Sequence, residues 1–127
     1  MRYRIDREAL VLNLDLKGAP SAQHALDLSV VLLTAQPELW GWDWIVEAPI
    51  VPEGASIEQI AQLARMYAAQ PQTLAVSALV SQDRNLHLWA RVMDFQFAGR
   101  RHLVVQSHDA ALRLIETQQA RRKMNRK

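Results

Sequence analysis

The chain has 127 residues, half of them hydrophobic, and no cysteine, so it can bury one core but cannot form disulfides, cysteine metal sites or thiol nucleophiles. Five of its fifteen Lys and Arg residues fall in positions 121–127, which leaves ten basic against thirteen acidic residues elsewhere, a net charge of −3. The charges therefore predict a mildly acidic single domain over 1–120 with a basic carboxy-terminal tail, and argue against specific nucleic-acid binding.

The sequence predicts neither a targeting segment nor a membrane-spanning segment. The chain starts with the charged run MRYRIDRE, which leads into no long apolar stretch, and no run approaches the roughly 18 apolar residues of a transmembrane helix. Because cysteine is also absent, we expect a cytoplasmic protein.

The amino-terminal segment predicts a β-hairpin followed by a helix. Residues 2–5 and 9–16 alternate in polarity as strands do, and a polar turn at 6–8 joins them. The second strand has leucines on one face and increasingly polar residues on the other, which favours antiparallel pairing with one solvated face. Pro20 suits the first turn of a helix over 20–35.

A strand, a loop rich in Pro and Gly, and a helix over 57–69 are predicted next. Trp42 and Trp44 lie on either side of Asp43, so both indoles share one face of the strand and Asp43 lies on the other. Ser56 and Gln59 have the spacing of a capping box, in which each side chain accepts a hydrogen bond from the other residue's backbone N–H. In open α/β sheets, such junctions at the carboxyl end of a strand are where ligand sites form.

The second half of the chain predicts two more strand–helix pairs. Residues 74–80 form an uncharged apolar run, typical of a central parallel strand covered on both faces, and a helix over 84–97 follows. A strand at 103–105 and a helix over 108–119, capped by Ser107, complete the pattern. The order β-β-α-β-α-β-α-β-α predicts an α/β domain with a single open, mixed but mostly parallel sheet of about five strands and about four helices.

This element order and three local patterns resemble the SpoIIAA-like family, small bacterial proteins with a STAS-like or CRAL-TRIO-like fold that are named after anti-sigma-factor antagonists. The patterns are YRIDREALVLNLDLKG at 3–18, WDWIVEA at 42–48 and HLVVQSHDAALRLIE at 102–116. The resemblance covers nearly the whole domain. It implies a non-enzymatic regulatory module that acts by protein–protein contact and uses no cofactor.

The resemblance also draws attention to the start of the helix over 57–69. In anti-sigma-factor antagonists a regulatory serine lies there, in an Asp-Ser-Ser-Gly pattern, whereas this chain has Glu53-Gly54-Ala55-Ser56. Only the hydroxyl at the helix start is shared. Ser56, with Glu53 beside it, is therefore a candidate phospho-switch, and helix capping is the alternative role of the same hydroxyl.

Other polar residues suggest little chemistry, and we predict no catalytic set. Glu47 and Glu53 could meet across the loop. One of them could then act as the general base of a hydrolase, which is a third hypothesis beside the two binding functions described below. The run Ser107-His108-Asp109 contains the residue types of a hydrolase triad, but consecutive residues cannot adopt its geometry. The remaining histidines lie in separate segments, so we expect no metal site.

Two apolar surfaces are candidates for contact with a ligand or a second subunit. Apolar residues of the helix over 84–97 cover more than the roughly 100° stripe that a surface helix needs for packing, and the tryptophan-rich strand adds to them. The alternative is that all of them belong to the core. The candidates are Trp42, Trp44, Leu88, Trp89, Val92 and Phe95.

The basic tail is expected to continue the last helix for about one turn and then to lie in solvent. Weak contact with an anionic membrane surface is the alternative, since each basic residue near a charged leaflet contributes on the order of 1 kcal/mol. The residues concerned are Arg121, Arg122, Lys123, Arg126 and Lys127.

Two functions remain open from the sequence. The first is a regulatory interaction module that uses the loop and helix beginning at Ala48 and binds another protein or a second copy of itself. The second is a carrier or sensor of an apolar small molecule, such as a lipid, held between the sheet and the third helix and brought to membranes by the tail. An apolar cavity at that place would favour the second function.

Overall fold

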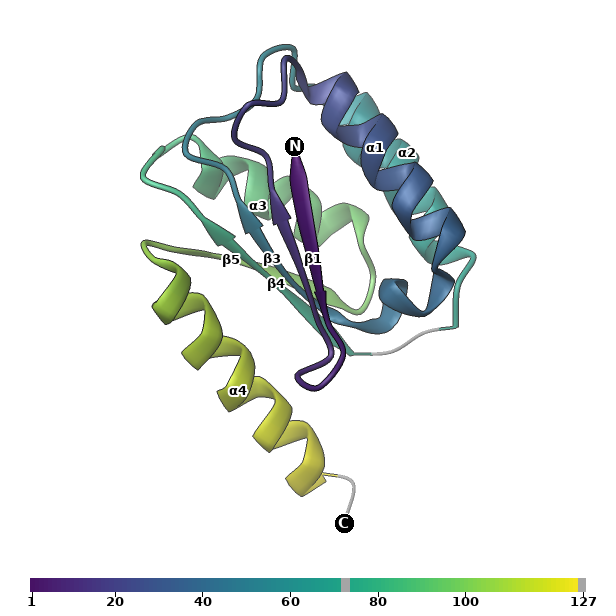
Figure 1. Cartoon of the computed structure of the whole chain (residues 1–127), viewed down its shortest axis with the longest axis vertical. Helices are drawn as coiled ribbons and strands as arrows, with labels where there is room; N and C mark the ends of the chain where they lie inside the picture. Colours follow the sequence, from purple (N-terminus) through teal and green to yellow (C-terminus); the bar gives the residue numbers. More distant parts are fainter. Residues whose placement is uncertain (72–73, 126–127) are drawn as a thin grey trace.

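The computed structural model describes residues 1–71 and 74–125, which form one five-stranded sheet and four α-helices (Figure 1). The predicted order of elements and the predicted α/β class are confirmed. The elements in chain order are β1 (Arg2–Asp6), β2 (Val11–Asp15), α1 (Ala22–Ala35), a 3-10 turn (Pro37–Gly41), β3 (Asp43–Glu47), α2 (Ile57–Ala68), β4 (Ala75–Val80), α3 (Leu86–Gln96), β5 (Arg100–Val105) and α4 (His108–Asn125).

The strands lie side by side in the order in which they occur along the chain. β1 and β2 pair antiparallel, and every later pair is parallel. Each parallel crossover connection therefore moves to the next strand in the same direction across the sheet. Right-handed crossovers that all move in one direction place their helices on the same face of the sheet. Accordingly α1, α2 and α3 cover one face of the sheet, and α4, which follows the last strand, crosses the other (Figure 1). We refer to these as the three-helix face and the α4 face.

Alternate residues of each strand supply the two cores. On the three-helix face, Leu12 and Trp44 pack with the leucines of α1 and with Tyr67 of α2. On the α4 face, the small cluster of Val11, Ile45 and Ala78 packs against α4. β4 is buried on both faces, as its uncharged apolar run predicts.

The expectation that β2 has one solvated face is wrong for its first half. Val11 is only 2% exposed because α4 covers it, and β2 is an internal strand that pairs with β3 as well as with β1. Asn13 and Asp15, farther along the same face, remain half-buried.

The helix starts follow the capping residues. α1 begins after Ser21, whose Oγ accepts a hydrogen bond from the backbone N–H of His24 at 3.1 Å, so Pro20 precedes the helix. Ser56 and Gln59 form the predicted capping box at the start of α2, with Ser56 N–H donating to Gln59 Oε1 at 2.8 Å. α1 and α2 thus start where a polar cap satisfies backbone donors, whereas Asn85 at the start of α3 makes no such side-chain bond.

The last helix is longer than the sequence predicts. α4 continues to Asn125, beyond the single turn expected after residue 119, because polar side chains of its last turns are bound to the sheet. Gln119 Nε2 and Arg122 Nη2 both donate to Oδ2 of the buried Asp43, at 2.9 and 2.6 Å. The basic tail is therefore helical as far as Asn125.

The three basic tail residues that the structure describes differ in environment. Arg122 is half-buried and also donates to the backbone oxygen of Leu74 at 2.6 Å, whereas Arg121 and Lys123 are exposed. Arg126 and Lys127 lie outside the described residues.

Over the described ranges, no helix has both the length and the apolar character needed to cross a bilayer.

Candidate ligand pocket

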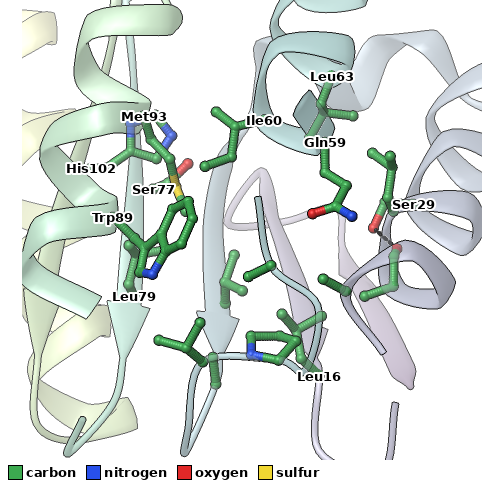
Figure 2. Close-up of a pocket in the computed structure, with 18 of the residues that line it drawn as sticks. Leu16, Ser29, Gln59, Ile60, Leu63, Ser77, Leu79, Trp89, Met93 and His102 are labelled. Carbon is green, nitrogen blue, oxygen red and sulfur yellow. Dashed lines mark hydrogen bonds between the residues drawn. The ribbon is translucent and has the colours of Figure 1, made fainter. Parts of the chain in front are cut away.

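An apolar pocket of about 190 Å³ lies between the sheet and the helices of the three-helix face (Figure 2). Its walls come from alternate residues near the carboxyl ends of β2, β3 and β4, from α1, α2 and α3, and from the loop between β3 and α2. This is the edge at which open α/β sheets bind ligands. The apolar lining labelled in Figure 2 consists of Leu16, Ile60, Leu63, Leu79, Trp89 and Met93.

The size of the side chains explains why the pocket lies at this end of the layer. The first half of the buried stripe on α1 contains two small residues, Ala25 and Ser29, which line the pocket together with the larger Leu26. The second half has Leu32 and Leu33, which fill the space over the other end of the sheet. The change from small to large side chains along one helix therefore leaves a cavity at one end only.

Aromatic rings fill the opposite end of the same layer. Trp40 stacks at a tilt against Trp44 and Tyr67, with centroids 6.1 and 6.2 Å apart, and Tyr67 lies 5.4 Å from Phe97. The indole N–H of Trp44 donates to the backbone oxygen of Leu39 at 2.8 Å. Buried rings in such tilted contacts make this half of the layer a rigid wall for the pocket.

Three polar side chains of the pocket lining, those of Ser29, Ser77 and Gln59, are already bound to other protein atoms. Ser29 Oγ donates to the backbone oxygen of Ala25 at 2.8 Å, and Ser77 Oγ accepts from Arg100 at 2.8 Å. Gln59 accepts from Ser56 N–H and donates to the backbone oxygen of Gly54 at 3.3 Å. The pocket thus offers apolar contact and few unpaired polar groups, which suits an apolar ligand.

Asp83 holds the loop that forms one wall of the pocket. Its carboxylate accepts hydrogen bonds from the backbone N–H groups of Val51, at 3.0 Å, and of Asn85, at 2.9 Å. The bond from Val51 and, to a smaller extent, the bond from Asn85 lower the pKa of Asp83 from its usual value. The loop between β3 and α2 is thereby attached to the turn that begins α3.

Arg100 supports the wall of the pocket from within the core. It is 2% exposed, and it donates to Ser77 Oγ and to the backbone oxygens of Trp40 and Trp42, the last at 2.5 Å. Its guanidinium lies 3.8 Å from the ring centroid of Trp44. Burial lowers the pKa of Arg100 to about 10, against the opposing effects of Tyr67 and Asp43, so the side chain is charged at neutral pH.

His102 is the titratable group in the lining. Burial lowers its pKa to about 4; its hydrogen bond to Asp94 opposes this shift, and the nearby Arg100 adds to it. The neutral ring donates from Nδ1 to Asp94 Oδ1 at 3.1 Å, and the same oxygen accepts the His102 backbone N–H at 2.6 Å. The 3.1 Å contact is therefore a hydrogen bond of a neutral imidazole at neutral pH and not an ion pair.

The structure divides the six apolar candidates between the pocket and the surface. Trp44 and Trp89 line the pocket. Leu88 and Phe95 are exposed, at 63% and 87%, and Val92 beside them is half-buried. Trp42 packs half-buried at the aromatic end of the layer.

The candidate acids lie on different features of the molecule. Glu47 is on the α4 face, where its Oε1 lies 3.0 Å from Nδ1 of His108. Glu53 is exposed in the loop, and its backbone oxygen accepts from the N–H of Ala22 at 2.7 Å. The structure brings Glu47 together with His108, a partner 61 positions away, and not with Glu53.

Sequence reasoning considered His108 only within the run Ser107-His108-Asp109 and therefore missed this contact. As predicted, Ser107 caps α4, with its Oγ accepting from Ala110 N–H at 3.1 Å. Within residues 1–71 and 74–125, no group of three or more His, Asp or Glu side chains could hold a metal ion. Comparisons of the chain with protein-family models, with curated proteins and with solved structures found no match.

Proposed function

We propose that the protein binds a small apolar molecule, such as a lipid acyl chain, in the pocket of the three-helix face and acts as its carrier or sensor. The observation that supports this most is the pocket's lining, in which apolar side chains predominate and the polar side chains of Ser29, Gln59 and Ser77 have protein partners. The described residues that line the pocket do not include a nucleophile, a base and oxyanion donors in a catalytic arrangement. Binding is therefore better supported than catalysis.

The volume limits the size of the ligand. At about 190 Å³, the pocket is smaller than the roughly 300–1,000 Å³ of sites for drug-sized molecules, so it suits a slender chain and not a bulky ring system. Trp89 and Met93 on α3 form one wall (Figure 2). The unbranched thioether of Met93 can adapt to ligands of slightly different shape.

Filling the pocket tests the proposal. Ser29→Leu places a larger apolar side chain in the lining, and we expect the affinity for a bound acyl chain to fall at least tenfold. The hydroxyl of Ser29 donates only to a carbonyl within its own helix, so the substitution should leave α1 intact. The measurement is isothermal titration calorimetry with saturated fatty acids of increasing length, after extraction and mass spectrometry of any lipid that co-purifies.

The matched control is Val31→Leu, which adds one methylene on the exposed side of the same helix and should bind like the wild type. Absence of both a co-purifying apolar molecule and any binding in the fatty-acid series would contradict the proposal. Equal affinity of the Ser29→Leu variant would show that the ligand lies elsewhere.

A second candidate function is contact with another protein or a second copy through the segment that begins at Ala48, as the SpoIIAA-like resemblance implies. The supporting observation is that Ile50 and Ile57, in the loop and in the first turn of α2, are 72% and 55% exposed. Ser56 lies between them. Its phosphorylation would add charge at a helix amino terminus beside this apolar pair.

Sedimentation velocity tests the self-association form of this second function. If the segment joins two copies, the wild type should sediment as a dimer, and Ile50→Asp with Ile57→Asp should give a monomer. Ser56→Asp should also weaken the dimer, because it places charge beside the pair. A wild type that is monomeric at high micromolar concentration would argue against self-association through this segment.

A further inference from the structure

A second, polar groove lies on the α4 face of the sheet. α4 contacts β3, β4 and β5 and runs obliquely across them (Figure 1), which leaves the α4 face near the carboxyl ends of β2 and β3 without a covering helix. The groove there has a volume of about 270 Å³. The polar residues that line it are Arg2, Arg4, Asn13, Asp15, Glu47 and His108.

Strand register brings these side chains together. Arg2 and Arg4 lie opposite Asp15 and Asn13 in the antiparallel pair of β1 and β2, and Asp15 lies opposite Glu47 in the parallel pair of β2 and β3. Because alternate residues of a strand share a face, all five point to the same side of the sheet.

His108 closes the groove from α4. It is the first residue of that helix, and its Nδ1 lies 3.0 Å from Glu47 Oε1. A carboxylate can only accept, so the ring nitrogen carries the proton and donates it. This bond fixes the Glu47 carboxylate at the edge of the groove.

Apart from the contact between His108 and Glu47, the charged side chains of the groove are not paired with one another. Among the described residues, no ion pair joins either arginine to an acid, although Arg2 lies opposite Asp15. Asp15 Oδ1 accepts only a backbone bond, from Lys17 N–H at 2.9 Å. Guanidinium donors and carboxylate acceptors therefore face the same space, both available to a bound molecule.

A buried acceptor in the groove points to a ligand with a hydrogen-bond donor. Oδ1 of Asn13 is buried and has no hydrogen-bond partner in the described part of the chain. Leaving a buried polar atom unsatisfied costs about 1–3 kcal/mol, and such atoms in native proteins call for an explanation. Because the oxygen is enclosed, a donor group on a molecule in the groove would satisfy it once the Asn13 amide turns toward the groove.

We propose that the groove binds a small zwitterion of the amino-acid class, with its carboxylate on Arg2 and Arg4 and its ammonium toward Asn13 Oδ1, Asp15 and Glu47. Guanidinium groups bind carboxylates through paired N–H donors, and an ammonium has three donors for the acceptors opposite. A purely anionic ligand would be repelled by the two acids. A purely cationic ligand would be repelled by the two arginines.

The volume agrees with a ligand of this class. At roughly 30 Å³ per water, a groove of about 270 Å³ has room for a molecule of about nine non-hydrogen atoms, the size of a common amino acid. The groove and the apolar pocket lie on opposite faces of the sheet. Binding in one can therefore be tested without the other.

Nuclear magnetic resonance titration of the ¹⁵N-labelled full chain tests the proposal. The probes are the twenty standard L-amino acids, each added separately, followed by two analogues of the best binder: its N-acetyl derivative, which lacks the ammonium, and its amide, which lacks the carboxylate. We expect saturable shifts confined to β1, to residues 13–15, and to Glu47 and His108. Both analogues should bind at least tenfold more weakly.

Variants then assign the two ends of the ligand. Arg4→Gln should weaken binding at least tenfold by removing a carboxylate donor, and Asp15→Asn should do so by removing the charge opposite the ammonium. Both positions are partly exposed, so the fold should persist. Arg101→Gln, an exposed site on β5 with the same charge change, is the matched control and should bind like the wild type.

Three results would overturn the proposal: no saturable shifts with any of the twenty amino acids, equal binding of the N-acetyl analogue or of inorganic phosphate, or unchanged affinity in both groove variants. Ser29→Leu, which fills the pocket on the other face, should leave amino-acid binding unchanged. Failure of the apolar-ligand function would therefore be distinguishable from failure of the groove.

Discussion

Arg100 and His102 are two residues apart on β5, both point into the three-helix layer, and burial affects their charges differently. Arg100 remains protonated at neutral pH because carbonyl oxygens and the ring of Trp44 replace its water. His102 is not protonated at neutral pH, because burial and the charge of Arg100 both disfavour the imidazolium. Its hydrogen bond to Asp94 offsets these two effects only in part. The same wall therefore contains one permanent cation and one neutral base.

The His102 shift predicts a loss of stability in mild acid. Its pKa of about 4 in the folded state lies below the reference value of 6.5, so the unfolded chain binds the proton first, and stability falls as the pH drops from about 6.5 toward 4. Between pH 7 and pH 5 the free energy of unfolding should decrease by about 2 kcal/mol through this group. Urea unfolding at the two pH values measures the change.

His102→Gln should lose most of this pH dependence. His24→Gln, at an exposed position on α1, should keep it and is the matched control. If the two variants show the same slope of stability against pH, acid sensitivity does not come from His102.

At the scale of elements, α4 shows what a hydrophobic pattern cannot detect. Its apolar stripe includes Ala111 and Ile115 and then continues on the same side of the helix as Gln119 and Arg122, whose polar groups bind Asp43. A prediction from apolar spacing ends the helix where the stripe becomes polar. The last two turns depend on a tertiary contact with the side chain of Asp43, a residue that is 3% exposed.

Removing the cation of this contact should be costly. Arg122→Ala leaves the buried Asp43 carboxylate with the Gln119 and Val76 N–H donors but without a positive partner. Breaking a buried pair from one side typically costs about 3 kcal/mol or more, so the free energy of unfolding in urea should fall by about that amount. Asp43→Asn in the same chain should recover part of the loss.

The neighbouring Arg121 supplies the control. Arg121→Ala removes the same charge from an exposed position and should change stability by less than about 0.5 kcal/mol. Equal losses in the two variants would mean that net charge, and not the contact with Asp43, determines the effect.

The elements predicted best are those whose burial is regular. Alternation in β3, the uncharged run of β4 and the caps at Ser56 and Ser107 were sufficient to predict the element order and the mixed sheet. The prediction begins β5 at residue 103, because Arg100 and His102 are polar. The burial of Arg100 depends on backbone oxygens of Trp40 and Trp42, about sixty positions earlier, and that of His102 on Asp94 of the neighbouring α3. Local sequence contains no sign of those partners.

The candidate sites were predictable only in part. The carboxyl edge of the strands was the expected place for a site, and Trp44 and Trp89 do line a pocket there. The cavity itself depends on how the small side chains of α1 lie relative to the larger ones of α2 and α3, which only the assembled layer shows. The groove on the α4 face requires β1, β2, β3 and α4 to be assembled, so its residues appear in the sequence as unrelated charged positions.

At the scale of the whole molecule, the two faces of the sheet have different character. Three helices cover one face and enclose an apolar space, whereas the single α4 leaves part of the other face open and polar. This asymmetry follows from one-directional crossovers. The domain can therefore carry two sites of opposite polarity, separated by a single layer of strands.

The sequential order of the strands also determines when each contact can form during synthesis of the chain. Every strand pairs with the strand made just before it, so the sheet can grow in the direction of synthesis, and its contacts close only short loops. The link between Gln119 and the backbone oxygen of Ala9, at 3.0 Å, is different because it joins residues 110 positions apart. Because α4 is synthesised after all five strands, this bond to the turn between β1 and β2 can form only when the whole sheet has been made.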